Sequence, residues 1–207
     1  MTEAEWLGAT KIDPMFDHLW AAKVHRRAPG QRRLRLFAAA CYRRVWDSAR
    51  DPELRATVEA AERFADKALT TRGFLDVVRH TSGLAMQLAN TCFNYLVFDP
   101  ADAAVKMARS KKAERAAQAV LLRCVFGSPF HPFAIDPRCL TADTVALARA
   151  AYDERLMPSG ELDSTRLAVL ADALEEAGVE GEPLEHLRGR GPHVRGCWVV
   201  DAVLGRR

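Results

Sequence analysis

The sequence predicts an all-α protein, a compact multi-helix array of about eight to ten helices. Apolar residues recur at helical spacing in most segments between turns, most clearly over residues 31–49 and 163–177. Several segments open with a capping residue followed at once by proline, as in Asp13-Pro14 and Asp51-Pro52. Residues 197–204 favour a strand locally, but an isolated strand has no partner, so we expect a helix there as well.

Capping residues, prolines and glycines divide the first half of the chain. The expected elements, in order, are a short helix from Thr2, a second from Asp13 through Trp20, an amphipathic helix over 31–49 after a break at Ala28-Pro29-Gly30, and a helix from Asp51 to about residue 68. The pattern over 70–98 is interrupted near Ser82-Gly83, which leaves either one bent helix or two. From Asp99-Pro100 an alanine-rich helix can be continuous to Phe126, with Gly127 as its C-terminal stop.

A proline-rich connection separates this front half from the back half. Residues 128–138 contain Pro129, Pro132 and Pro137, and prolines this dense exclude a helix. We expect this segment to cross between the two halves of a single domain over 1–207. Behind it, helices are expected over 141–156, 163–177, 183–187 and 197–204.

The composition is that of an ordinary globular protein. Apolar residues make up 49% of the chain and charged residues 28%, which argues against global disorder. No apolar run reaches the roughly 18 residues that a membrane span needs, and the first five residues are too acidic to open a signal peptide. We therefore expect a cytoplasmic protein without a membrane partner.

Charge is distributed unevenly along the chain. Residues 21–50 hold nine Lys or Arg against one Asp, a net charge of +8, and residues 141–185 hold eleven acids against three arginines, a net charge of −8. Guanidinium groups form forked hydrogen bonds to phosphates and carboxylates. The candidate anion or partner contacts are therefore Arg32, Arg35, Arg43 and Arg44. Pairing with the acidic region of the same chain and binding of an external partner such as nucleic acid both stay open.

The stretch 191–205 combines turn residues, polar groups and apolar bulk. Trp198 and the valines after it should dock into the core, because exposed apolar surface costs about 25 cal/mol per Å². We call this docked apolar segment the plug. The polar residues His193, Arg195 and Asp201 are expected to form a cluster that binds the plug to neighbouring turns and helices.

The same stretch offers candidates for a metal site. His193 and Cys197 are one helical turn apart, and His186 precedes them. A structural zinc site needs four ligands, and the fourth would have to come from Cys139 or His131, which the spacing does not nominate. The five cysteines are scattered singly without a CxxC pair, which indicates neither a disulfide framework nor a zinc ribbon. We therefore predict no metal ligand and no cofactor.

Catalytic candidates fall in this stretch too. Cys197, His193 and Asp201 are the residue types of a thiol nucleophile, its base and an orienting carboxylate. Because Cys197 should be buried, where the pKa of a thiol rises and its reactivity falls, we predict no catalytic residue. The carboxylates of 153–154 and 172–176 recur at surface spacing without a histidine or Gly-rich partner, and we expect them to form a solvated acidic face.

Four segments that together span almost the whole chain carry a resemblance to a known family. They are LRLFAAACYRRVW at 34–46, LLRCVFGSPF at 121–130, LADALEEAG at 170–178 and HVRGCWVVD at 193–201. This set resembles an expanded family of planctomycete-type bacterial proteins, and the third segment is also similar to a motif in a repeat-companion domain of the same bacteria. The resemblance implies a bacterial protein but no chemistry, because no activity, cofactor or catalytic residue is established for the family.

These observations favour a non-catalytic protein-interaction or regulatory module that binds an unknown protein partner. The alternative is a nucleic-acid-associated module that uses the arginine-rich face of the 31–50 helix. A small hydrolase or metalloenzyme centred on His193 and Cys197 is the third possibility.

Overall fold

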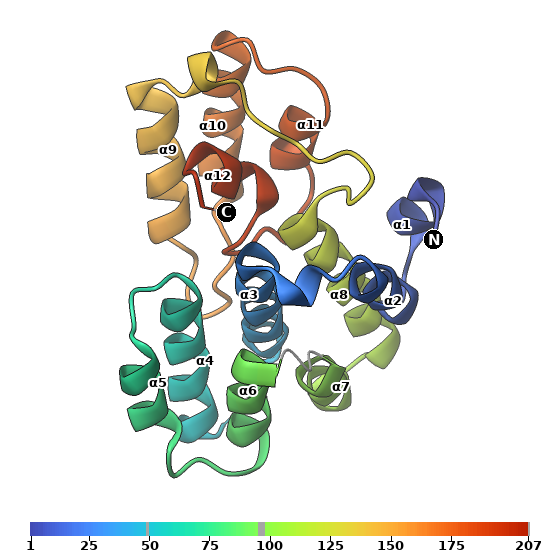
Figure 1. Cartoon of the computed structure of the whole chain (residues 1–207), viewed down its shortest axis with the longest axis vertical. Coiled ribbons are helices and arrows are strands. Elements are labelled where there is room, and N and C mark those ends of the chain that lie inside the picture. The colour runs from blue at the N-terminus through green and yellow to red at the C-terminus, as the bar shows by residue number, and fades with distance from the viewer. Residues whose placement is uncertain (49, 95–97, 207) are drawn as a thin grey trace. The chain divides into compact units, whose positions relative to one another are not determined.

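The computed structural model describes residues 1–48, 50–94 and 98–206, and it confirms the all-α prediction. Within these ranges the chain is 67% helical and forms twelve α-helices, ten of them at least seven residues long, and no strands (Figure 1). None of the described helices has the length and apolar character needed to cross a membrane. The chain divides into two compact units, Met1–Ala119 and Val120–Arg207, called here the N-terminal and C-terminal units. The single domain expected over 1–207 stays a prediction.

The N-terminal unit is built around one central helix. Its elements are α1 (Glu3–Gly8), α2 (Asp13–Ala21), the short 3-10 helix η1 (Val24–Arg26), α3 (Ala28–Arg44), α4 (Pro52–Ala65), α5 (Thr71–Val78), α6 (Gly83–Asn94), α7 (Phe98–Met107) and the first part of α8 (Lys111–Phe126). Helix α3 contacts α4, α6 and α7, and Figure 1 shows it in the midst of these helices. The alanines at 38–40 are all buried, and such small side chains let neighbouring helices approach α3 closely.

Helix α3 differs from the predicted amphipathic helix in its start and in its burial. Ala28-Pro29-Gly30 forms its first turn rather than a break, because proline is tolerated where the backbone N–H has no partner within the helix. Gly30 is required there, since a Cβ atom would lie 2.1 Å from the carbonyl oxygen of Val24. The helix is also buried nearly all round, and Arg32 and Arg43, which belong to its predicted arginine-rich face, are only 8% and 3% exposed.

Other boundaries of the N-terminal unit follow the predicted caps only in part. Asp51 caps α4 as expected. Residues 79–82 separate α5 from α6, which begins at Gly83 with a φ of +51°, so the alternative of two helices is confirmed. Asp13 is not a cap, because Ile12 holds that position without a side-chain hydrogen bond. The option of one continuous helix from Asp99 to Phe126 is wrong, since α7 and α8 are separate helices. Ala49 and residues 95–97, which fall in predicted helices, lie outside the described residues.

The C-terminal unit follows the sequence prediction closely. After the end of α8 it contains the 3-10 helix η2 (Pro137–Cys139), α9 (Ala142–Asp153), α10 (Ser164–Glu176), α11 (Glu182–Arg188) and α12 (Trp198–Val203). Thr141 and Asp163 cap α9 and α10 through their side chains. The connection predicted to be non-helical over 128–138 is so from Ser128 to Asp136, but its last two residues begin η2, because proline is tolerated in the first turn of a helix. Helix α10 packs on α9 and α11, and α12 contacts the same two helices. The predicted plug is confirmed, because Trp198, Val199, Val200 and Val203 are all at most 6% exposed.

Candidate metal centre

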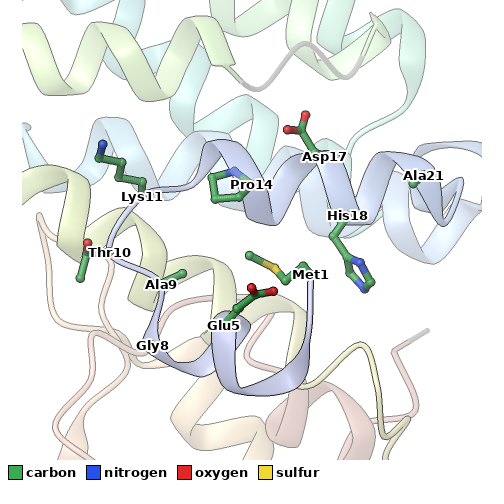
Figure 2. A pocket seen from close by; sticks show the side chains of 10 residues that line it. All are labelled: Met1, Glu5, Gly8, Ala9, Thr10, Lys11, Pro14, Asp17, His18 and Ala21. Carbon is green, nitrogen blue, oxygen red and sulfur yellow. The ribbon is translucent and has the colours of Figure 1, made fainter.

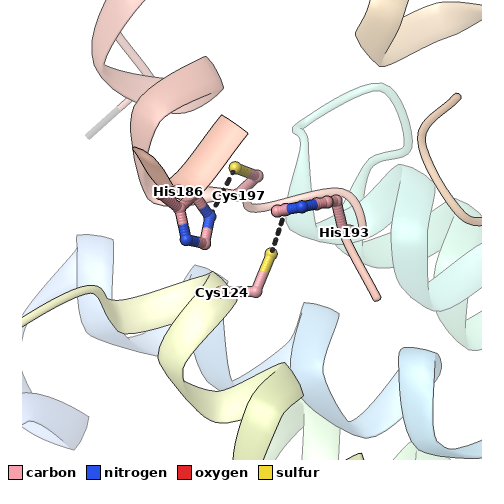
Figure 3. Close-up of side chains that lie close together, drawn as sticks. All are labelled: Cys124, His186, His193 and Cys197. Atoms are coloured by element: carbon pink, nitrogen blue, oxygen red, sulfur yellow. Dashed lines mark hydrogen bonds between the residues drawn. The ribbon is translucent and has the colours of Figure 1, made fainter. Parts of the chain in front are cut away.

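Four metal-ligating side chains of the C-terminal unit lie close together. They belong to Cys124, His186, His193 and Cys197, and one nitrogen or sulfur atom from each lies within 4.8 Å of the other three. Figure 3 shows the four side chains directed toward a common centre. Three of them are at most 5% exposed, and His186 is half-buried.

Helices hold Cys124 and His186 in position. Cys124 lies in the last turn of α8, just before Gly127, whose φ of +66° ends the helix. His186 lies in α11 between Leu184 and Leu187, which are both buried. At 100° per residue His186 therefore lies at the edge of the buried face of α11, which accounts for its half-buried state.

Backbone contacts hold His193 and Cys197 in the segment before α12. The N–H of Leu162 donates a hydrogen bond to the carbonyl of His193, with 2.8 Å between the heavy atoms. The N–H of Cys197 donates to the carbonyl of Val194 at 2.9 Å and closes a β-turn. Gly196 is the third residue of this turn and has a φ of +88°, which glycine adopts without strain.

The spacing of the ligand atoms suits a tetrahedral metal ion. Sγ of Cys197 lies 3.4 Å from Nε2 of His186, and Sγ of Cys124 lies 3.9 Å from Nδ1 of His193. Around tetrahedral zinc, with Zn–S near 2.3 Å and Zn–N near 2.0–2.1 Å, neighbouring ligand atoms are about 3.3–3.8 Å apart. No pair exceeds 4.8 Å, so binding requires the ligand atoms to approach one another by about 1.5 Å at most.

Nε2 of His193, the ring nitrogen that faces away from the cluster, has a backbone carbonyl as its partner, as is usual in metal-binding histidines. This atom lies 3.2 Å from the carbonyl oxygen of Gly189, and an N–H there donates to that carbonyl. This hydrogen bond leaves Nδ1, the atom that faces the cluster, free of its proton for a metal. The ring of His186 packs edge-on against that of His193, with 4.8 Å between centroids, and against Trp198 at 5.3 Å.

The four groups also perturb one another's protonation. Burial acts to raise the pKa of the Cys197 thiol, but hydrogen bonds from Cys124 and His186 and the charge of His186 stabilise the thiolate and bring the pKa well below its usual value. The hydrogen bond to Cys197, together with burial, raises the pKa of the Cys124 thiol. Cys197 is buried as expected, but the contacts with Cys124 and His186 lower its pKa, where burial was expected to raise it.

Two thiols and two imidazoles form a donor set that is selective for particular metals. Thiolate and imidazole together suit Zn²⁺, and a tetrahedral set of two sulfur and two nitrogen atoms is typical of structural zinc. Two thiolates would also neutralise the charge of the ion, which matters because an uncompensated charge is costly in a buried site.

Comparison with known proteins identifies no relative of this chain. No family model, curated protein or solved structure matches the chain. The case for the metal centre therefore depends on the geometry of its four side chains.

The structure supplies a fourth ligand that the sequence did not indicate. Cys139 and His131 were the only candidates for a fourth ligand, and no spacing favoured either, but Cys124 completes the group, 62 residues before His186 in the sequence. Its surroundings in the sequence, Leu-Leu-Arg-Cys-Val-Phe, resemble any buried helix end.

The three residues of the predicted polar cluster at the C-terminal segment lie in three different environments. His193 belongs to the metal centre. The guanidinium of Arg195 lies 3.9 Å from a carboxylate oxygen of Asp153 and faces the ring of Tyr152 at 5.1 Å. Asp201 is 1% exposed in the first turn of α12.

The four candidate arginines contact groups within the N-terminal unit. Three form ion pairs, which are Arg32 with Asp66 at 2.8 Å, Arg43 with Glu62 at 2.9 Å and Arg44 with Glu114 at 3.1 Å. Arg35 donates to the backbone carbonyl of Cys92 at 2.8 Å and faces the ring of Phe64. These contacts give no support to a phosphate-binding surface. A change of Arg43 to Glu would set two buried carboxylates against each other, so it would test the fold rather than nucleic-acid binding.

A cavity of about 850 Å³ in the N-terminal unit is a weaker candidate site. It lies beside α1 and α2, and its polar lining includes Glu5, Lys11, Asp17 and His18. Figure 2 shows Glu5 and His18 extending toward the space between the two helices, whereas the carboxylate of Asp17 points away from it. Elsewhere in the described ranges, no second group of three or more His, Cys, Asp and Glu is arranged for a metal.

Proposed function

We propose that this chain is a zinc-binding protein in which Cys124, His186, His193 and Cys197 hold one Zn²⁺. The observation that carries the proposal is the convergence of these four ligand atoms within 4.8 Å of one another. The hydrogen bond from His193 to Gly189 supports it independently, because metal-binding histidines usually donate their other N–H to a carbonyl or carboxylate.

The centre is structural rather than catalytic. A catalytic zinc ion keeps one position open for water or substrate, whereas four protein ligands fill the tetrahedron. The ligands come from α8, from α11 and from the segment that leads into α12, so one ion joins three parts of the C-terminal unit. A closed, buried ion contributes to stability and leaves no position for a reacting group.

Metal titration of the full chain tests this proposal. The metal-free protein should bind one Co²⁺ or Zn²⁺ per chain, and the cobalt form should show the visible absorption and the thiolate charge-transfer bands of a tetrahedral S₂N₂ site. Cys124→Ser should weaken binding at least 100-fold, because it removes one of the two thiolates.

Cys139→Ser is the matched control for the titration, since Cys139 is a buried cysteine of the same unit outside the cluster. This variant should bind cobalt as the wild type does. Absence of the tetrahedral spectrum in the wild-type chain, or its equal loss in both variants, would contradict the zinc site.

At the level of the whole chain, we propose a non-catalytic interaction or regulatory module whose C-terminal unit is fixed by zinc. A closed metal site supports a structural role, and Leu156 and Met157 provide an apolar contact point because they are 50% and 58% exposed in the turn after α9. Contiguous exposed apolar surface marks protein-binding sites.

Affinity capture from the native cells tests the interaction role. Zinc-loaded protein should retain a partner after nuclease treatment, and the double variant Leu156→Ser, Met157→Ser should lose that partner while still binding one zinc ion. Retention that nuclease abolishes would instead favour the nucleic-acid alternative. Equal retention by the double variant would exclude this turn as the contact point.

A further inference from the structure

The two sulfur atoms of the centre would remain close to each other after loss of the metal. Sγ of Cys124 and Sγ of Cys197 are both among the ligand atoms that lie within 4.8 Å of one another. A disulfide needs an S–S separation of about 2.05 Å, so the two sulfur atoms would have to approach by less than about 3 Å. Cys139, the other cysteine of the C-terminal unit, is not part of the cluster.

A disulfide between these cysteines would join the same elements as the metal does. Cys124 lies at the end of α8, and Cys197 is the residue that precedes α12. The two positions are 73 residues apart in the sequence, so the cross-link would close most of the C-terminal unit into one loop. Cross-links that close long loops restrict the unfolded chain strongly, and a disulfide here would retain much of the constraint that zinc provides.

His186 is the most accessible of the four ligands, so a small oxidant would reach the sulfur atoms most readily beside it. It is the one ligand that is half-buried, whereas Cys124, His193 and Cys197 are buried. It is also the ligand whose Nε2 lies 3.4 Å from Sγ of Cys197. Movement of the His186 ring away from the cluster would therefore expose Cys197 before Cys124.

We propose that the centre is a redox-responsive clasp in which a hydroperoxide oxidises Cys124 and Cys197 to a disulfide and zinc leaves. This inference rests on the zinc site proposed above. The clasp has two closed forms, one held by zinc and one by the disulfide, and both hold α12 to the end of α8.

The oxidation balances with a hydroperoxide as the only co-reactant. The Cys197 thiolate attacks the peroxide, an S–O bond forms, the O–O bond breaks, and the leaving oxygen takes a proton to become water or an alcohol. The Cys124 thiolate then attacks the Cys197 sulfur, an S–S bond forms, the S–O bond breaks, and hydroxide leaves and takes a second proton. Two thiolates lose two electrons, the peroxide gains them, and zinc remains Zn²⁺.

Zinc release follows from the loss of the thiolates. After oxidation only His186 and His193 remain as ligands, and two neutral imidazoles provide half of a structural site. Reduction of the disulfide restores both thiolates, so rebinding of zinc makes the cycle reversible.

The experiment treats the zinc-loaded full chain with one equivalent of hydrogen peroxide. Zinc release, measured with a chromogenic chelator, should occur in a ratio of one ion for every two thiols lost. Peptide mass spectrometry should find Cys124 joined to Cys197 and should find Cys41, Cys92 and Cys139 as thiols. Dithiothreitol with added zinc should restore the metal content, and the Cys139→Ser control should behave as the wild type does.

Each other outcome decides against the clasp. Thiols that oxidise while zinc stays bound, or zinc loss with a different cysteine pairing or with sulfinic acids, would overturn it and leave the zinc site in place. A purified chain that binds no zinc before peroxide is added would overturn the proposed function and the clasp together. The metal content before oxidation therefore separates the two failures.

Discussion

Removal of the metal should strongly destabilise the C-terminal unit. The ion would join α8, α11 and the segment before α12, and without it the buried site would hold two thiols and two imidazoles in place of a neutral metal complex. Apparent zinc-binding free energies in small zinc modules are about 10–16 kcal/mol at neutral pH, as large as the whole stability of about 5–15 kcal/mol of an ordinary domain. Chelation should therefore lower the melting temperature by about 15 °C or more.

Amide hydrogen exchange shows which helices lose stability when the metal is removed. On addition of a strong chelator, the amides of α11 and α12 should lose their protection, whereas those of α3 and α4 in the N-terminal unit should keep theirs. Cys197→Ser should show the same exchange pattern without a chelator, and Cys139→Ser should match the zinc-loaded wild type. Persistent protection of α11 and α12 in the metal-free chain would show that the four side chains are packed without a structural ion.

The helices of the C-terminal unit could be predicted because their boundaries depend on local chemistry. The predicted helix over 163–177 is found as Ser164–Glu176, since the side chain of Asp163 caps it. Where a boundary depends on tertiary packing, the prediction was wrong. Ala28-Pro29-Gly30 has the composition of a loop, yet it forms a helical turn at which Gly30 packs against Val24.

The arginines of α3 illustrate a second limit of sequence patterns. A helical projection separates apolar from charged faces, but it does not show which residues of other helices cover each face. Glu62 and Asp66 lie 19 and 34 residues after the arginines they bind, so no local spacing connects the pairs. The net charge of +8 over 21–50 is thus partly neutralised by acids of the same unit.

The metal centre could be predicted only in part, because one of its ligands lies far from the others in the sequence. His186, His193 and Cys197 fall within twelve residues, so the sequence places these three ligands close together. Cys124 joins them only because the end of α8 folds against the C-terminal segment. A ligand set that is completed by tertiary contact has no fixed spacing, unlike the short pairs that identify zinc fingers and ribbons.

Replacement of Trp198 by alanine should destabilise the C-terminal unit without removing a metal ligand. Its side chain is 6% exposed, and its ring lies 5.1 Å from that of Phe133 and 5.3 Å from that of His186. A Cβ atom on Gly127 would lie 3.0 Å from the indole, which shows how closely the ring packs on the end of α8. Loss of a buried tryptophan costs about 3–5 kcal/mol, measurable by denaturant unfolding of the zinc-loaded chain.

The same variant separates packing from coordination at the centre. Trp198→Ala should still bind one zinc ion, but about 10–100-fold more weakly, because the indole no longer holds the ring of His186 in place. Phe133→Ala is the matched control, since this ring also contacts Trp198 but is 36% exposed and does not belong to the metal site. Its loss should therefore lower the free energy of unfolding by less and leave the zinc affinity unchanged. If Trp198→Ala cost no more than Phe133→Ala, the segment after Gly191 would be held by the metal alone, and its apolar residues would not form the plug that their burial indicates.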